Sequence, residues 1–153
     1  MTILLVDDEP DYRMLVRTVL MERGCDVILA ENGQEALDKL KGPSPDLVIT
    51  DIYMPVMDGL RMSRTLRGMP GFEKMPILFL SGYDDQHTLD AVKDPRYEGF
   101  LRKGAPMEEL VKWIDYLTTP LEKRPRLVSK GTTTRTNLRL NDRSRTFTNF
   151  PTM

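Results

Sequence analysis

The chain has 153 residues, of which 40% are hydrophobic and 29% charged, enough to bury one core and little more than one domain. Its single cysteine, Cys25, excludes an internal disulfide, and no apolar run is long enough to span a membrane. The N-terminus reaches Asp7 after a short apolar stretch with no basic region. It therefore predicts a first strand rather than a signal peptide, and a cytoplasmic protein.

The net charge of −1 hides an uneven distribution of charged residues. Residues 1–118 carry 14 Lys and Arg against 21 Asp and Glu, a net charge of −7, whereas residues 119–153 carry 8 against 2, a net charge of +6. We therefore expect one acidic domain over residues 1–119, followed by a basic C-terminal extension over residues 120–153.

Short apolar runs and helical spacings alternate along the first of these two segments. Pro10 suits a first helical turn, Gly24 ends that helix, and Asn32 caps the next one. The expected strands cover residues 3–6, 27–30, 47–50, 76–80 and 97–101, and the expected helices cover residues 10–23, 33–40, 60–66, 84–94 and 107–117.

This alternation predicts an α/β fold: a doubly wound, five-stranded parallel sheet with helices on both faces, joined by right-handed crossovers. The run Leu47-Val48-Ile49 supports the prediction, because an apolar run without alternation suits a strand that is buried on both faces.

Polar residues follow the expected strands where the strands end: Asp7 and Asp8 after the first, Asp51 after the third, Ser81 after the fourth and Lys103 after the fifth. The carboxyl ends of parallel strands share one edge, where ligands bind in such sheets. Each residue alone could be a helix cap, a turn residue or a surface lysine, but together they place three carboxylates in one cleft. That arrangement calls for a cation such as Mg²⁺, and it makes Asp51 a candidate covalent phosphoryl acceptor.

The motifs LLVDDEP, DIYMPVMDG, LS and FLRKG, at these spacings, resemble the receiver domain of the two-component response-regulator family, with its five-stranded flavodoxin-like (βα)5 fold. The resemblance covers residues 1 to about 119. It implies a Mg²⁺-dependent transfer of a phosphoryl group to Asp51. The residue roles that it implies are metal binding by Asp7, Asp8, Asp51 and the backbone carbonyl of Tyr53, phosphate binding by Lys103, and switching by the Ser81 hydroxyl and the Phe100 ring.

The implied mechanism is a two-state switch in which Ser81 and Lys103 move toward the phosphorylated aspartate and Phe100 fills the vacated space. The implied phosphoryl donor is a sensor histidine kinase or a histidine phosphotransfer protein. The face formed by residues 82–118 would bind a downstream protein and is a candidate homodimer interface. Such a protein is not an enzyme beyond its own phosphorylation and dephosphorylation, and nothing favours binding to nucleic acid or a membrane.

Three positions depart from the family pattern. Gly104 follows Lys103 where proline is common, and the proline arrives at Pro106. The stretch Ala91 to Gly99 lacks the run of small residues that is typical before the fifth strand, and its Pro95-Arg96-Tyr97 suggests a local rearrangement of the output face. Tyr53 is bulky where water reaches the phosphoryl group, so we expect slow self-dephosphorylation.

Several alternatives remain at this stage. The extension from Thr134 onward partly alternates and predicts a hairpin, or it is disordered. The chain could be the receiver fragment of a longer regulator whose output domain is missing. It could also be an interaction module that works without phosphorylation, or a Mg²⁺-dependent phosphohydrolase, although Asp51-Ile52-Tyr53 lacks the second acid of the Asp-x-Asp pair that such enzymes usually carry.

Overall fold

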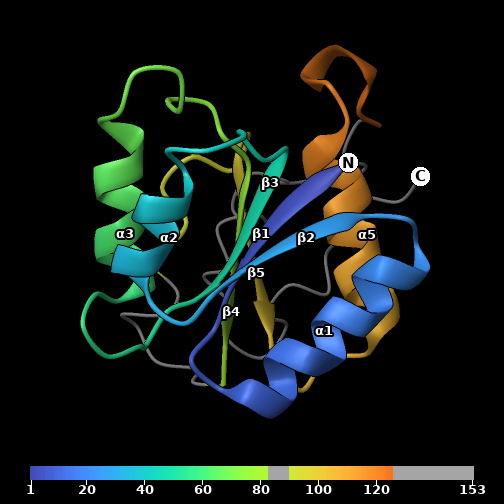
Figure 1. The fold of residues 1–153 in the computed structure, drawn as a ribbon. Coiled ribbons are helices and arrows are strands. Elements are labelled where there is room, and N and C mark those ends of the chain that lie inside the picture. The colour runs from blue at the N-terminus through green and yellow to red at the C-terminus, as the bar shows by residue number, and fades with distance from the viewer. Residues whose placement is uncertain (83–89, 126–153) are drawn as a thin grey trace.

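The computed structural model describes residues 1–82 and 90–125, which contain a five-stranded parallel sheet in the order β2-β1-β3-β4-β5 (Figure 1). The strands are Thr2–Val6 (β1), Asp26–Ala30 (β2), Leu47–Asp51 (β3), Ile77–Ser81 (β4) and Glu98–Arg102 (β5). The helices are Pro10–Glu22 (α1), Gly33–Lys39 (α2), Gly59–Arg67 (α3), Met107–Thr118 (α5) and the short 3-10 helix Leu121–Lys123 (η1).

Helices cover both faces of this sheet. Helices α1 and α5 pack on one face, and α2 and α3 pack on the other (Figure 1). Every residue of β3 and β4 is buried, which explains why their sequences are apolar without alternation. The structure thus confirms the predicted doubly wound fold. Because β1 has β2 on one side and β3 on the other, the strand order reverses there, and a crevice opens at the carboxyl ends of β1 and β3.

Local signals in the sequence set most helix ends. Pro10 is the first residue of α1, and Gly24, at a φ of +81°, follows the end of that helix. The side chain of Asn32 accepts a hydrogen bond from the Glu35 amide at 2.9 Å and caps α2. Asp58 caps α3 in the same way, accepting from the Arg61 amide at 2.7 Å. These caps fix where each helix begins relative to the strand before it.

The packing of α5 on the sheet depends on a glycine in β5. Trp113 of α5 is 5% exposed and lies directly against Gly99, where an added Cβ would stand 2.5 Å from the indole ring. Glycine is unfavourable within a strand, but Gly99 leaves the space that lets Trp113, the largest side chain of α5, reach the sheet.

An ionic network ties together the end of α3 and the segment before β5. Arg67 pairs with Glu98, which is 5% exposed, at 2.9 Å, and its guanidinium also donates to the Met75 carbonyl at 2.7 Å. The other Glu98 oxygen accepts from the amides of Lys93 and Asp94 at 2.8 and 3.3 Å. The sequence predicted a helix over residues 84–94. Residues 84–89 lie outside the described part. Residues 90–94 are not helical: residues 90 and 91 form a turn, and Glu98 binds the amides of Lys93 and Asp94.

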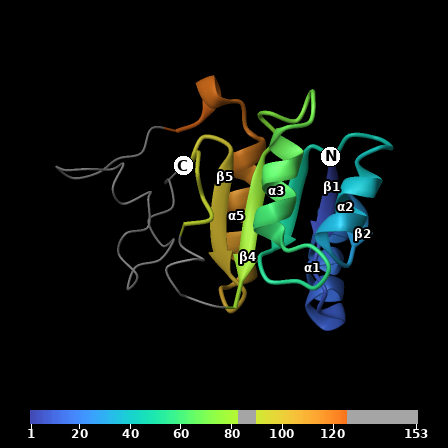
Figure 2. The ribbon, with the colours of Figure 1, turned by 90° about the vertical axis from the view of Figure 1, so that its left-hand side faces the viewer.

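The chain after α5 folds back along it. The Arg124 guanidinium lies over the Tyr116 ring, 4.6 Å from its centroid. It donates to the carbonyls of Arg96 at 2.6 Å, Thr119 at 2.8 Å and Leu117 at 3.2 Å. These contacts satisfy carbonyls at the end of α5 and hold η1 at the end of the molecule where the strands begin (Figure 2). The predicted hairpin from Thr134 onward lies outside the described residues.

We predict that Gly99→Ala lowers the free energy of unfolding by about 1–3 kcal/mol, because the new methyl group would overlap Trp113 and force the helix away from the sheet. Urea unfolding followed by circular dichroism measures the loss. Gly104→Ala is the matched control, since a Cβ there has nothing within 4 Å. Equal stability of the two variants would contradict the packing argument.

Candidate functional site

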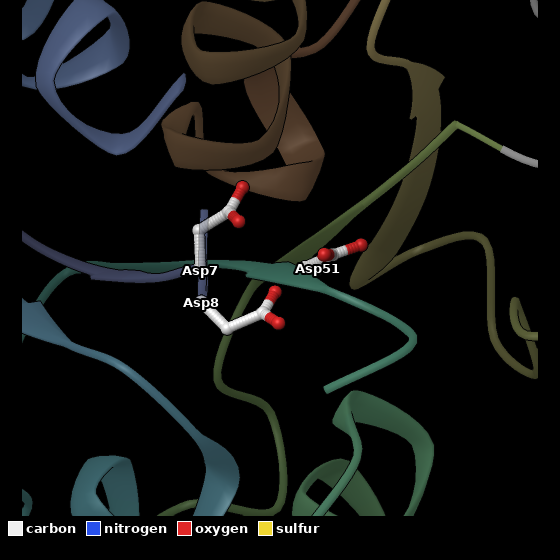
Figure 3. Close-up of side chains that lie close together, drawn as sticks. All are labelled: Asp7, Asp8 and Asp51. Atoms are coloured by element: carbon white, nitrogen blue, oxygen red, sulfur yellow. The ribbon is translucent and has the colours of Figure 1, made fainter. Parts of the chain in front are cut away.

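The five polar residues expected at the strand ends do meet at one edge of the sheet. Asp7 and Asp8 follow β1, Asp51 and Ser81 are the last residues of β3 and β4, and Lys103 follows β5. The three aspartates each offer a carboxylate oxygen within 4.8 Å of the other two, and their side chains converge on one space (Figure 3). Asp7 and Asp51 are buried, whereas Asp8 is exposed.

Backbone contacts fix the loop after β1. The Asp7 amide donates to the Ala30 carbonyl at 3.0 Å, which continues the β1–β2 ladder by one residue. The Asp7 carboxylate accepts from the Glu9 amide at 2.9 Å. Arg13 of α1 donates to the Asp7 carbonyl at 2.6 Å and pairs with Glu31, which follows β2, at 3.6 Å. The loop is thus held from both sides, so its acids project into the cleft.

The loop after β3 is built tightly around Asp51. Oδ1 of Asp51 accepts from the Ile52 amide at 2.8 Å, and the Thr50 hydroxyl donates to the Asp51 carbonyl at 2.8 Å. Gly59, at the start of α3, donates its amide to the Ile52 carbonyl at 2.7 Å, and a Cβ on Gly59 would collide with the Asp51 carbonyl oxygen. The Asp-Gly pair in the motif therefore serves two purposes: Asp58 caps α3, and Gly59 lets the helix start against the aspartate.

The Lys103 ammonium lies among the carboxylates. Its Nζ is 3.0 Å from Oδ2 of Asp7, 3.1 Å from Oδ2 of Asp51 and 3.3 Å from Oε1 of Glu9. The same ammonium stands over the Tyr12 ring, 4.9 Å from its centroid. The Lys103 side chain is 16% exposed, so this charge is largely withdrawn from water and shared by the acids.

Burial and the lysine set the ionisation of the site. Burial raises the pKa of Asp51 to about 6 despite the nearby ammonium, and burial also raises the pKa of Asp7. Burial alone would lower the pKa of Lys103, but its hydrogen bond to Asp7 and the charges of both aspartates outweigh it and raise that pKa. Burial raises the pKa of Tyr12 to about 12, so its phenol stays neutral.

The donor set of this cleft fits a hard divalent cation. Oδ2 of Asp7 is fully buried and accepts no hydrogen bond of good geometry, although the Lys103 ammonium lies 3.0 Å away. A buried carboxylate oxygen without a hydrogen bond keeps a lone pair for another positive ligand. Mg²⁺ prefers oxygen ligands, and the three aspartates supply carboxylate oxygens to one cleft. Tyr53, whose carbonyl is the fourth expected ligand, lies in the loop after Asp51 with its side chain 36% exposed.

The two expected switch residues are both inside the protein. Ser81 is 0% exposed, and its carbonyl accepts from the Lys103 amide at 3.0 Å, which joins the ends of β4 and β5. Phe100 is 1% exposed and pairs with Phe79 across the two strands. The Phe100 ring therefore occupies the inward position, which the resemblance associates with the switched state.

Sequence reasoning missed three residues that shape the site, namely Glu9, Tyr12 and Arg13. Tyr12 shares its helical spacing with core residues of α1, so the pattern indicated packing alone. Its ring also contacts a lysine from the far end of the domain, which no local pattern encodes. The position of Glu9 next to two aspartates was the one available signal for a role in the site.

Comparisons with known proteins agree with this geometry. The family model for the response regulator receiver domain matches residues 3–115. A response regulator named MprA from Mycolicibacterium vanbaalenii is 38% identical over 121 residues, which cover 77% of this chain and 52% of that protein. The chain belongs to the response regulator receiver family. It spans about half the length of that relative.

Solved structures show the same likeness. The chemotaxis protein CheY4 of Vibrio cholerae superimposes with a TM-score of 0.70 at 30% identity, covering 76% of this chain and 97% of that one. The response regulator TrrA of Thermotoga maritima, solved in complex with Mg²⁺ and BeF, gives a TM-score of 0.64 at 33% identity with the same coverage. Receiver domains bind Mg²⁺ at an acidic pocket, and the aspartates of this chain form such a pocket.

We predict that Asp51→Asn stabilises the metal-free protein near neutral pH by about 1–2 kcal/mol. The carboxyl titrates at a pKa near 3.8 in an unfolded chain and about 6 in the fold, so only the unfolded state releases its proton in between. Stability therefore falls as pH rises through that window, and the amide removes this loss. Urea unfolding in a chelator would show the gain near neutral pH and little gain below the unfolded pKa.

The control for this measurement is Asp26→Asn, because Asp26 is exposed at the start of β2. A gain for Asp51→Asn that stays the same at both pH values would show that the effect is not electrostatic.

Proposed function

We propose that this chain accepts a phosphoryl group on Asp51 from a sensor histidine kinase or histidine phosphotransfer protein, in a Mg²⁺-dependent reaction, and thereby changes its binding to a partner. The observation that carries the proposal is the state of Asp51. It is 6% exposed, its Oδ1 is held by the Ile52 amide, and its Oδ2 faces Lys103 beside the two acids that follow β1.

In the transfer step, a carboxylate oxygen of Asp51 forms a bond to phosphorus while the bond from phosphorus to the donor imidazole nitrogen breaks, and that nitrogen keeps the electron pair. The Lys103 ammonium, already 3.1 Å from Oδ2, would neutralise charge on the transferred oxygens, and the Ser81 hydroxyl would donate to one of them. Mg²⁺ bound by Asp7, Asp8, Asp51 and the Tyr53 carbonyl would supply further positive charge at those oxygens.

The partner-binding face proposed here is formed by residues 82–118. Ser81 directly precedes this segment and Lys103 belongs to it. The hydrogen bond from the Lys103 amide to the Ser81 carbonyl joins β4 to β5, so movement of either residue bears on both strands. Because Phe100 is already buried, we propose that switching in this chain acts mainly through the Ser81 hydroxyl and less through inward rotation of Phe100. A downstream protein, or a second copy of the chain, would read the change.

Receiver domains act with histidine kinases and downstream targets, so a signalling role needs no turnover of an external substrate. We propose that the chain is not an enzyme beyond its own phosphorylation and dephosphorylation. In the described residues no helix is long and apolar enough to cross a membrane. A cytoplasmic location stays a prediction. An interaction module independent of phosphorylation, or a fragment of a longer regulator, remains the alternative.

We predict that the protein gains one phosphoryl group when incubated with acetyl phosphate and Mg²⁺, as measured by intact mass. The gain disappears in Asp51→Asn, which lacks the nucleophile, and in a chelator. Asp26→Asn, at an exposed position, should behave like the native protein. A folded native protein that gains no phosphoryl group would support the phosphorylation-independent module instead.

We also predict that Tyr53→Asn shortens the lifetime of the acyl phosphate several-fold. Tyr53 follows Asp51 by two residues and is 36% exposed, so its large side chain should hinder the water that attacks the phosphorus, and the smaller asparagine should open that path. The rate is measured by intact mass after the phosphoryl donor is removed. Val56→Asn in the same loop is the control, because Val56 is 76% exposed. An unchanged lifetime in Tyr53→Asn would reject the gating role.

A further inference from the structure

Besides acids, the Lys103 ammonium contacts a group that carries no charge, the Tyr12 ring of α1. Lys103 Nζ stands 4.9 Å from the ring centroid, a distance at which the face of an aromatic ring attracts a cation. The other neighbours are the carboxylates of Asp7, Asp51 and Glu9. The ammonium thus sits between a group of acids and a neutral aromatic face.

The difference between charged and uncharged neighbours matters when the site binds a metal ion and a phosphoryl group. A metal ion and a phosphoryl group would both compete for the carboxylates that now hold Lys103, so those ion pairs are lost or rearranged during the reaction. The Tyr12 ring is uncharged, so neither a metal ion nor a phosphoryl group would compete for it. Its contact with the ammonium would therefore be kept when the site is loaded. It is therefore suited to hold the lysine when its acidic partners are taken.

The ring itself is held firmly by its surroundings. Tyr12 packs against the hydrophobic core from the first turn of α1. The next residue, Arg13, donates to the Asp7 carbonyl at 2.6 Å, which ties that turn of the helix to the acidic loop. A tyrosine has only two side-chain torsions to order, whereas lysine has a long flexible stem, so the rigid ring can restrict the lysine at little entropic cost.

We propose that Tyr12 is a positioning residue that acts through Lys103: its ring keeps the ammonium beside Asp51 before and after phosphoryl transfer. This inference rests on the proposed function for its effect on rate, but the placement of the lysine can be measured without any phosphorylation.

The rate test compares Tyr12→Leu with Tyr12→Phe in phosphorylation by acetyl phosphate and Mg²⁺. We expect Tyr12→Leu to be slower by roughly fivefold or more, the value of a partly desolvated cation–π contact, and Tyr12→Phe to remain within about twofold of native because it keeps the ring. Met14→Leu, at an exposed position of the same helix, should match the native protein.

A double-mutant cycle separates positioning from general damage to the fold. If Tyr12 acts through Lys103, adding Tyr12→Leu to Lys103→Met slows the reaction no further. An equal loss in both backgrounds, or a native rate for Tyr12→Leu, would overturn the proposal. If Tyr12→Leu does not fold, as judged by thermal unfolding, Tyr12→Met offers a flexible side chain that fills the same space.

The placement test uses the metal-free protein. The ring current of Tyr12 should shift the NMR signals of the Lys103 side-chain methylene groups upfield in native protein and in Tyr12→Phe, and this shift should vanish in Tyr12→Leu. Identical Lys103 signals in all three proteins would overturn the inference even if phosphorylation occurs. A native protein that takes up no phosphoryl group would instead reject the proposed function, and the NMR comparison would still decide whether Tyr12 holds the lysine.

Discussion

The structure depends most on one charge balance, the sharing of the Lys103 ammonium by carboxylates from two loops. Asp7 is fully buried and Asp51 nearly so, and neither could stay ionised there without a cation within reach. Lysine meets that need in the metal-free protein, since it lies about 3 Å from both acids. The same contact joins the end of β5 to the ends of β1 and β3, so the edge that holds the reactive acid is also bound together by it.

A second ion pair lies at the opposite edge of the sheet, where β5 begins. Arg67 forms an ion pair with the buried Glu98, and both carboxylate oxygens of Glu98 accept hydrogen bonds. Such a pair contributes little to the free energy of folding, because the cost of removing two charges from water roughly cancels their attraction. Its effect is to set the path of the segment before β5. The two ion-pair groups differ in one respect. Both carboxylate oxygens of Glu98 accept hydrogen bonds, whereas beside Lys103 the buried Oδ2 of Asp7 accepts none.

Much of this fold and site could be predicted from sequence, because the signals are local or follow from topology. Apolar runs such as Leu47-Val48-Ile49 marked buried strands, Asn32 marked a cap, and parallel strands brought Asp51 and Lys103 to one edge. What could not be predicted depends on contacts between distant residues. The non-helical path of residues 90–94 depends on the side chain of Glu98, and the contact of Tyr12 depends on a lysine that meets it only in the folded protein.

The anchoring of Arg124 has a consequence for anything joined to the chain at its C-terminal side. Its three carbonyl partners lie at the end of α5 and just before β5, so Arg124 lies at the pole opposite Asp51. A tag, a dye or an additional domain attached directly after residue 125, in a chain shortened to that point, would begin at that pole, about the length of a five-residue strand from the acidic cleft. Fusions to a chain shortened at residue 125 therefore suit experiments in which the phosphorylation site must stay open to a large donor protein.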